Sequence, residues 1–486
     1  MKKIYAFMIA FATLLPSCNN WLDIDPALEI REGQMFGAEQ GFMDVLTGAY
    51  IRVATPTLYG LNTTMRLPEL MAQHWTPVAN TLSAYLGNFD FEQSDCKQLF
   101  ESIWLQYYQT IINLNALLAE IDDNKGLFAN GNYELIKGEA MGLRAFLHFE
   151  VLRYWGAAPT VAVMSEKAIP YTREVTKNPN LLLSLPYQEV LRRVLEDLDE
   201  AERLLANDPI RVYSNGVLNS IGTLAGVNEN LPHPADEFHY FRQARFNYYA
   251  VKAAKARYYA WTGDMAKAAE LALEVINAKS ADDNPQFSLG AEINAGNGQL
   301  TFPTEHIFAV NNSTATVTLT PVFFNYSTAY TQTVPLLNTA FESTLHTSDI
   351  RYRANRLWES RAVPLTNTSF NYFKKYNEAE KTAVSDVPLI RLSEMYFLAV
   401  EGGNTDLFRA YRIARNLDGS IDGTLTTPEE VMARLEKEYR KEFYGEGQMF
   451  FFYKRLGRER FTWPAGKDVA VGNYRLPIPE SQSVFE

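Results

Sequence analysis

The side chains that most often carry out catalysis occur here without the spacing that catalysis needs. The six histidines form no metal-binding pattern of the His-Glu-x-x-His kind, and the best alternative, His233 and His239 beside Asp236, lies in a loop next to prolines. There is no Gly-x-Ser-x-Gly nucleophile turn, no phosphate-binding loop and no Gly-x-Gly-x-x-Gly motif after a strand. The sequence therefore predicts a protein that is not an enzyme and holds neither a metal nor a cofactor.

Acidic pairs are the remaining candidates for catalysis. Glu69 and Asp90 have the residue types of a glycosidase dyad, but that mechanism depends on the distance between the two carboxylates, which the sequence does not give. The chain has 57 Asp and Glu residues, so a pair chosen by eye is more typical of a solvated surface. A secreted glycosidase is the less favoured alternative.

The high content of aromatic side chains is the most unusual feature of the composition. It contains 29 Phe, 27 Tyr and 7 Trp, or 13% of 486 residues, and tyrosine has a polar tip that does not need full burial. A sugar can pack its C–H face on such rings while its hydroxyls bind polar side chains, and loops on a rigid scaffold usually carry recognition. Two irregular stretches, 55–95 and 315–330, concentrate rings of this kind. We expect ligand contacts from Trp75, Asn80, Tyr85, Asn325, Tyr326 and Tyr330.

Charge and hydropathy exclude several other classes of protein. The 45 Lys and Arg residues against 57 Asp and Glu residues give a net charge of −12, which argues against a nucleic-acid partner. The chain is 47% hydrophobic and 21% charged, as in folded globular proteins. The apolar run Ile4–Leu15 is too short to span a bilayer, so a polytopic membrane protein is excluded.

The N-terminus has the pattern of a bacterial lipoprotein signal. Two lysines and a short apolar run open the chain, Ser17 directly precedes Cys18, and Leu15 lies three residues before that cysteine. We predict a signal peptide over residues 1–17, a lipid on Cys18, and an N-terminal tether over residues 18–40. A plain secretory signal with an unmodified cysteine is the alternative.

Helices are the elements that must position the aromatic loops. Apolar residues at helical spacing predict helices over about 99–121, 133–154, 187–205, 246–261, 265–279, 390–402, 407–416 and 428–444. The alanine-rich segment 246–279 surrounds a Thr-Gly-Asp turn and predicts a helical hairpin of the tetratricopeptide type. Weaker pairs of the same kind are expected within 99–154 and 390–416.

The intervening segment 280–388 is rich in glycine and asparagine, which predicts a long loop face with minor strand. No linker divides the chain. We therefore predict a mainly α fold with tetratricopeptide-like hairpins and a loop-rich face. It forms a single domain over residues 41–486, with an N-terminal half of about 41–240 and a C-terminal half of about 241–486.

Five further stretches have the form of sequence motifs and cover nearly the whole chain after the signal. In chain order, they are Cys18 followed by Trp-Leu-Asp-Ile-Asp-Pro at 21–26, Glu-Ala to Gly-Ala-Ala-Pro at 139–159, Arg-Leu-Ser-Glu-Met-Tyr within 388–401, Glu-Tyr-Arg to Glu-Gly at 438–447, and Leu-Pro-Ile-Pro at 476–479. Taken together, these stretches resemble the SusD/RagB family of outer-membrane lipoproteins from the Bacteroidetes. One departure is Gln448, where the family usually has arginine.

The resemblance implies a SusD-like fold and a lipid-anchored protein on the cell surface, at the outer membrane. It implies an oligosaccharide ligand and a SusC-like TonB-dependent transporter as the partner that receives it. A peptide ligand, as in RagB-like members, is one alternative, and a helical scaffold that binds only proteins is another. The matching stretches have the character of scaffold, so the resemblance assigns no ligand contacts.

Overall fold

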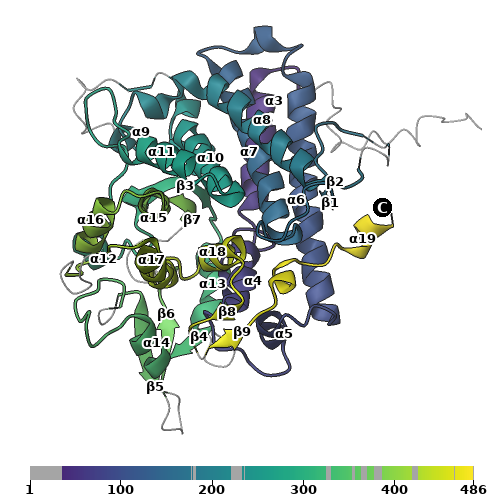
Figure 1. Cartoon of the computed structure of the whole chain (residues 1–486). Helices are drawn as coiled ribbons and strands as arrows, with labels where there is room; N and C mark the ends of the chain where they lie inside the picture. Colours follow the sequence, from purple (N-terminus) through teal and green to yellow (C-terminus); the bar gives the residue numbers. More distant parts are fainter. Residues whose placement is uncertain are drawn as a thin grey trace, which may run out of the picture.

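Helices make up most of the described chain, as the spacing of apolar residues predicts. The computed structural model describes residues 35–176, 178, 182–220, 233–234, 236–324, 330–352, 356–362, 369–376, 386–418, 425–464 and 466–484. The helices, which Figure 1 labels where there is room, are α3 (Glu39–Val53), α4 (Leu67–Met71), α5 (Leu82–Asn88), α6 (Ser94–Glu120), α7 (Asn132–Trp155), α8 (Tyr187–Leu204), α9 (Asn215–Leu218), α10 (Tyr248–Thr262), α11 (Met265–Ile276), α12 (Glu292–Gly296), α13 (Ala315–Phe324), α14 (Val334–Ala340), α15 (Leu392–Glu401), α16 (Asp406–Ala414), α17 (Pro428–Glu442), α18 (Gln448–Leu456) and α19 (Glu480–Ser483).

The strands are short and pair only in small antiparallel sheets within the described residues. Among the described residues there are three two-stranded sheets and one three-stranded sheet, in which β6 is the central strand. The pairs are β1 (Lys167–Ile169) with β2 (Leu185–Pro186), β3 (His306–Asn311) with β7 (Asp386–Arg391), and β8 (Arg460–Phe461) with β9 (Lys467–Asp468); the larger sheet has the order β4 (Thr331–Thr333), β6 (Ser369–Phe373), β5 (Trp358–Ala362).

The predicted helical hairpins are present. Helix α6 packs against α7, α10 against α11 and α15 against α16, and further contacts of α8 with α7 and α10 and of α11 with α15 join the pairs into one helical layer (Figure 1). Gly263 takes a φ of +90° in the turn after α10, and the Asp264 side chain then accepts the backbone N–H of Lys267 at 3.0 Å, which caps α11. The mainly α fold is confirmed.

Two predicted elements are wrong. Residues 315–324 were expected in loop or strand but form α13, because Ala315, Leu319 and Phe323 recur every four residues and are all buried. The helix expected over 390–402 begins only at Leu392, because the residues before it pair with β3 as strand β7. Tertiary pairing here overrides the local spacing. The expected irregular stretch 55–95 also contains the short helices α4 and α5, and α18 was not predicted.

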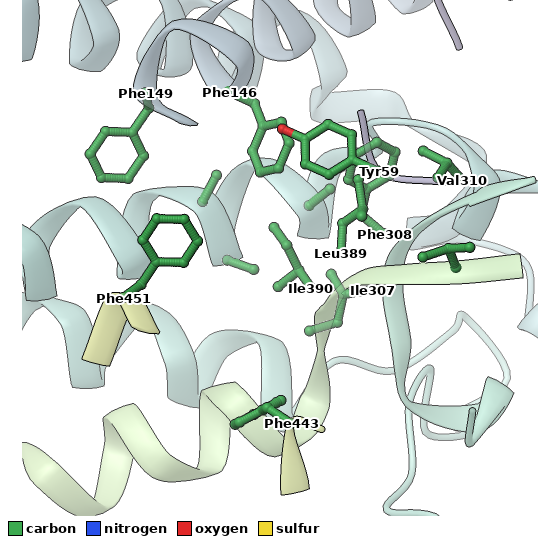
Figure 2. Close-up of a cluster of buried hydrophobic side chains, with 14 of the residues drawn as sticks. Tyr59, Phe146, Phe149, Ile307, Phe308, Val310, Leu389, Ile390, Phe443 and Phe451 are labelled. Carbon is green, nitrogen blue, oxygen red and sulfur yellow. The ribbon is translucent and has the colours of Figure 1, made fainter. Parts of the chain in front are cut away.

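The hydrophobic core is continuous, and it includes the contact between α7 and strand β3. One cluster of buried residues extends from Phe36 to Leu476. In Figure 2, Phe146 of α7 points toward these strands, and its ring centroid lies 5.7 Å from that of Phe308 on β3. Phe451 of α18, a helix near the C-terminal end of the chain, belongs to the same cluster (Figure 2). Helices from both ends of the chain thus share one core.

A network of buried ion pairs joins the C-terminal helices to the same strands. Glu442, the last residue of α17, lies 2.8 Å from Arg391 of β7 and 2.7 Å from Arg415 after α16. Glu305, just before β3, lies 2.9 Å and 2.6 Å from the same two arginines. All four side chains are fully buried. Buried charges require such partners, so the network favours a single placement of these segments.

The predicted signal peptide, Cys18 and the tether as far as residue 34 lie outside the described residues. The predicted tether extends to residue 40, but α3 already begins at Glu39. In the part of the chain that the structure describes, no helix has both the length and the apolar character needed to cross a membrane.

Candidate ligand-binding site

The two aromatic-rich stretches singled out in the sequence lie side by side in the structure. The backbone N–H of Thr76 donates to the carbonyl of Thr331 at 3.0 Å, and its hydroxyl donates to Oε1 of Gln332 at 2.8 Å. Nε2 of Gln332 in turn donates to the carbonyl of His74 at 3.1 Å. These bonds attach residues 74–76 to strand β4, although the two segments are about 256 residues apart in the chain.

Trp75 belongs to the core, which corrects the expectation that its ring contacts a ligand directly. Its side chain is 1% exposed, and its indole N–H donates to the carbonyl of Met65 at 2.9 Å. The rings of Phe323, Phe373 and Tyr444 lie 5.4–5.7 Å from it. Its position in a loop suggested exposure, but a loop that packs across a core can bury a large ring. Trp75 instead supports the ring next to it.

That neighbouring ring is Tyr330, which lies parallel to Trp75 with a centroid distance of 6.1 Å and an interplanar angle of 13°. The Tyr330 side chain is partly exposed, and its hydroxyl oxygen accepts Nε of Arg66 at 3.0 Å. Arg66 ends a π-helical turn, Asn62–Arg66, and its Nη1 donates to Oδ1 of Asn62 at 2.9 Å. Burial raises the pKa of Tyr330 and the Arg66 charge partly opposes that shift, so the phenol is neutral at physiological pH.

The other predicted site residues lie at different places. Asn80 is exposed in a turn with a φ of +58°, a conformation that asparagine tolerates. Tyr85 on α5 is partly buried and packs against the core. Asn325 and Tyr326 lie outside the described residues. Among the described residues of the predicted set, only Trp75 and Tyr330 contact each other, through their stacked rings.

We call the group Arg66, Trp75, Thr76, Tyr330 and Gln332 the Tyr330 platform. It offers an aromatic ring held in place by a second ring, and beside it a guanidinium that no described carboxylate pairs with. Nη2 of that guanidinium forms no hydrogen bond within the described residues. A ring with an adjacent fork of N–H donors can stack against a sugar and bind its hydroxyls.

Sequence reasoning missed Arg66, Thr76 and Gln332. Arg66 has Glu69 three residues later, a spacing that suggests an ordinary ion pair on a helix surface. In the structure Glu69 is fully buried and bonds to His74 and Gly447. Arg66 instead donates a hydrogen bond to the hydroxyl of Tyr330. Thr76 and Gln332 carry no signal in the sequence, because their role follows from a pairing between distant segments.

The alternative glycosidase dyad is not assembled. Glu69 is fully buried, with one oxygen 2.7 Å from Nδ1 of His74 and the other accepting the N–H of Gly447 at 2.8 Å. Asp90 lies on the surface and accepts a hydrogen bond from Gln93 at 2.9 Å. A buried carboxylate with both oxygens occupied does not face a substrate, so Glu69 has a structural role.

The histidine loop also has structural partners. Nε2 of His239 lies 2.8 Å from Oδ1 of Asn132, and Asp236 accepts Asn132 at 2.8 Å, Asn130 at 3.1 Å and the N–H of Phe238 at 2.9 Å. Among the residues that the structure describes, no three His, Cys, Asp or Glu side chains are grouped as metal ligands.

Comparisons with known proteins agree on one family. Residues 20–216 match a family described as SusD-like, "starch-binding associating with outer membrane". The chain is 26% identical over 216 residues to the SusD-like protein P38 of Formosa agariphila, a match that spans 42% of this chain and 39% of that protein. The chain therefore matches well under half the length of this curated relative.

Solved structures match over nearly the whole chain. A SusD superfamily protein from Bacteroides thetaiotaomicron has a TM-score of 0.68 at 18% identity, covering 92% of this chain and 98% of its own. A protein described as a putative sugar-binding protein from Bacteroides vulgatus has the same TM-score at 17% identity, covering 92% and 96%. At this identity the likeness shows the fold. The family match over residues 20–216 and the curated relative support membership of the SusD/RagB family.

Proposed function

We propose that the protein binds a glycan through the Tyr330 platform and does not catalyse a reaction. The observation that carries this proposal is the pairing of the partly exposed Tyr330 ring with Arg66, which has no carboxylate partner among the described residues. A pyranose packs its C–H face on the ring, while its hydroxyls accept from Arg66 and donate to the hydroxyl oxygen of Thr76, whose own proton is given to Gln332. The family description as starch-binding supports a glycan over a peptide.

The same proposal includes the place of the protein in the cell. Cys18 carries a lipid that anchors the protein at the outer membrane, on the cell surface, and the bound oligosaccharide is passed to a SusC-like TonB-dependent transporter. The lipobox pattern at residues 15–18 and the family description as associated with the outer membrane support this arrangement. Stable attachment by lipid needs more than one acyl chain, as bacterial lipoproteins have.

Titration calorimetry against a panel of polysaccharides and peptides tests the ligand class. We expect a glycan ligand and an affinity loss of at least tenfold, about 1.4 kcal/mol, in Tyr330→Ala. Arg66→Lys should also weaken binding, because lysine lacks the Nε that fixes the tyrosine hydroxyl. Tyr259→Ala removes a ring from α10 that is likewise partly exposed, and it should leave the affinity unchanged. Binding of peptides alone would contradict a glycan function.

Membrane fractionation tests the anchor. Cys18→Ala removes the thiol that receives the lipid, so the protein should move from the outer-membrane fraction to the soluble one. Cys96→Ala is the matched control, because Cys96 is buried in α6 and should not affect attachment. Continued membrane attachment of the Cys18 variant would argue against lipidation.

A further inference from the structure

A cavity of about 620 Å³ opens between α3, β3 and the segment just before α10. None of its lining residues belongs to the Tyr330 platform. The volume lies within the range of small-molecule binding sites, which are mostly apolar with a few fixed polar groups. Its apolar surface includes Tyr50, Ile51 and Phe241.

Phe241 is held in an unusual backbone conformation at this cavity. Its φ of 53° and ψ of 40° lie in the left-handed region, which costs free energy for any residue with a Cβ. Its N–H donates to the carbonyl of Leu218 at 2.9 Å, and 46% of the side chain is exposed. An exposed ring contributes little to folding, so a strained backbone that displays one points to contact with a ligand.

Two hydrogen-bonded pairs fix acceptor groups in the lining. Nδ2 of Asn311 donates to Oδ1 of Asp386 at 2.9 Å, and Nδ2 of Asn219 donates to Oε1 of Gln243 at 2.8 Å. Gln243 is itself fixed, because its Nε2 donates to the carbonyl of His306 at 2.6 Å. The Oδ1 atoms of Asn311 and Asn219 and the Oδ2 atom of Asp386 have no hydrogen-bond partner within the described residues.

Arg245 adds a donor to the same lining. Its guanidinium carbon lies 4.1 Å from the ring centroid of Phe238, which holds the side chain in place. Its Nη1 is buried and forms no hydrogen bond with any residue that the structure describes, although Oε2 of Glu139 lies 3.6 Å away. Arg245 is therefore balanced in charge but still has an N–H group to donate.

The chemistry of these groups selects the ligand. An anionic ligand would meet Asp386, and a cationic ligand would meet Arg245. A purely apolar ligand would cover both charges without offering them partners, which costs free energy. A hydroxyl both donates and accepts, so a ring that carries several hydroxyls satisfies the carboxylate, the amides and the guanidinium, while its C–H face packs on Phe241.

We propose that this cavity is a second saccharide site, which holds one neutral pyranose ring against Phe241. The site does not depend on the Tyr330 platform, because the two share no residue. Sugar binding here should persist when the platform is removed.

Saturation-transfer NMR of the full chain with glucose, galactose, mannose, xylose and N-acetylglucosamine tests the proposal. The experiment is done in the Arg66→Ala/Tyr330→Ala background, which removes the platform. We expect saturation transfer to the ring C–H protons of at least one of these sugars. Phe241→Ala and Asp386→Asn should each weaken that binding at least fivefold. Ile413→Ala removes an exposed apolar side chain from α16 and should leave it unchanged.

Phe241→Gly separates loss of the ring from loss of the fold, because glycine adopts the left-handed conformation without strain. This variant should keep the melting temperature of the parent and still lose the sugar signal. The proposal is overturned if none of the five sugars gives a signal, or if Phe241→Ala and Phe241→Gly leave the signal unchanged. Either result leaves the calorimetric test of the platform unaffected.

Discussion

At the scale of single residues, charged side chains of the stretches that resemble the SusD/RagB family form ion pairs inside the protein. Glu442 lies 2.8 Å from Arg391 and 2.7 Å from Arg415, with no solvent exposure. Burial by itself raises the pKa of Glu442, but the charges of Arg415 and Arg391 outweigh it and hold that pKa well below its usual range. Gln448, at the departure from the family pattern, accepts Nη2 of Arg153 at 3.2 Å. These residues maintain the scaffold.

Glu442→Gln should strongly destabilise the protein. The change removes one of the two buried carboxylates that Arg391 and Arg415 share, which leaves the cluster with uncompensated positive charge and costs about 3–5 kcal/mol of unfolding free energy. Glu200→Gln is the matched control, because Glu200 pairs with Arg203 on the exposed surface of α8. That change should cost no more than about 1 kcal/mol. Urea denaturation of both variants measures the difference, and equal losses would contradict a special role of the buried network.

At the scale of elements, the turn between α17 and α18 connects the scaffold to the platform. Gly447 has a φ of +75°, and a Cβ on it would lie 2.5 Å from Cγ of Pro68 in α4. Its N–H donates to Glu69 of the same helix. Helix α4 directly follows the π-helical turn that ends at Arg66, so this close approach helps to hold Arg66 beside Tyr330.

Gly447→Ala should therefore affect both stability and binding. The left-handed conformation alone costs roughly 1–2 kcal/mol for alanine, and the contact with Pro68 adds to that cost. Gly48→Ala is the control: its Cβ meets nothing within 4 Å and it lies inside α3, where alanine is favoured by about 0.5–1 kcal/mol. Thermal melting should show opposite signs for the two variants. The affinity for glycan should fall only for Gly447→Ala.

At the scale of the whole molecule, we propose that residues 41–486 form one folding unit. The buried cluster that reaches from Phe36 to Leu476 supports this, as do the ion pairs between Glu305 and Arg415, which lie 110 residues apart. A unit with one core and shared buried charges is expected to unfold cooperatively, although chains of this length often fold through intermediates.

Acid unfolding tests both the folding unit and its charges. Burial by itself raises the pKa of Glu438, but Lys441 and Arg351 outweigh it and lower the pKa to about 2. Since the unfolded value is about 4.3, the resulting stability is fully present above that pH and is lost as the pH falls toward 2. Circular dichroism and tryptophan fluorescence should follow the same single transition. Glu438→Gln should reduce the dependence of stability on pH between about 4.3 and 2, and separate transitions would argue against one unit.

Much of the fold could be predicted because it depends on local periodicity. The helical hairpins around Gly263 and within residues 99–154 follow from apolar spacing and a glycine turn, which act over one or two helical turns. The start of α15 could not be predicted, because residues 386–391 became a strand only by pairing with β3, about 80 residues earlier. The candidate site could not be predicted for the same reason, because Arg66, Thr76 and Gln332 take up their roles only when distant segments pair.

The sequence by itself determined the helical scaffold, the lipobox pattern at Cys18, and the two stretches from which the aromatic rings of the platform come. Only the tertiary structure decided which rings are available to a ligand. Trp75 and Tyr330 are both aromatic residues in irregular segments, yet the first is buried and the second is partly exposed. The difference arises because exposure depends on what packs against a side chain, and here the packing partners come from segments about 260 residues apart, which local sequence does not encode.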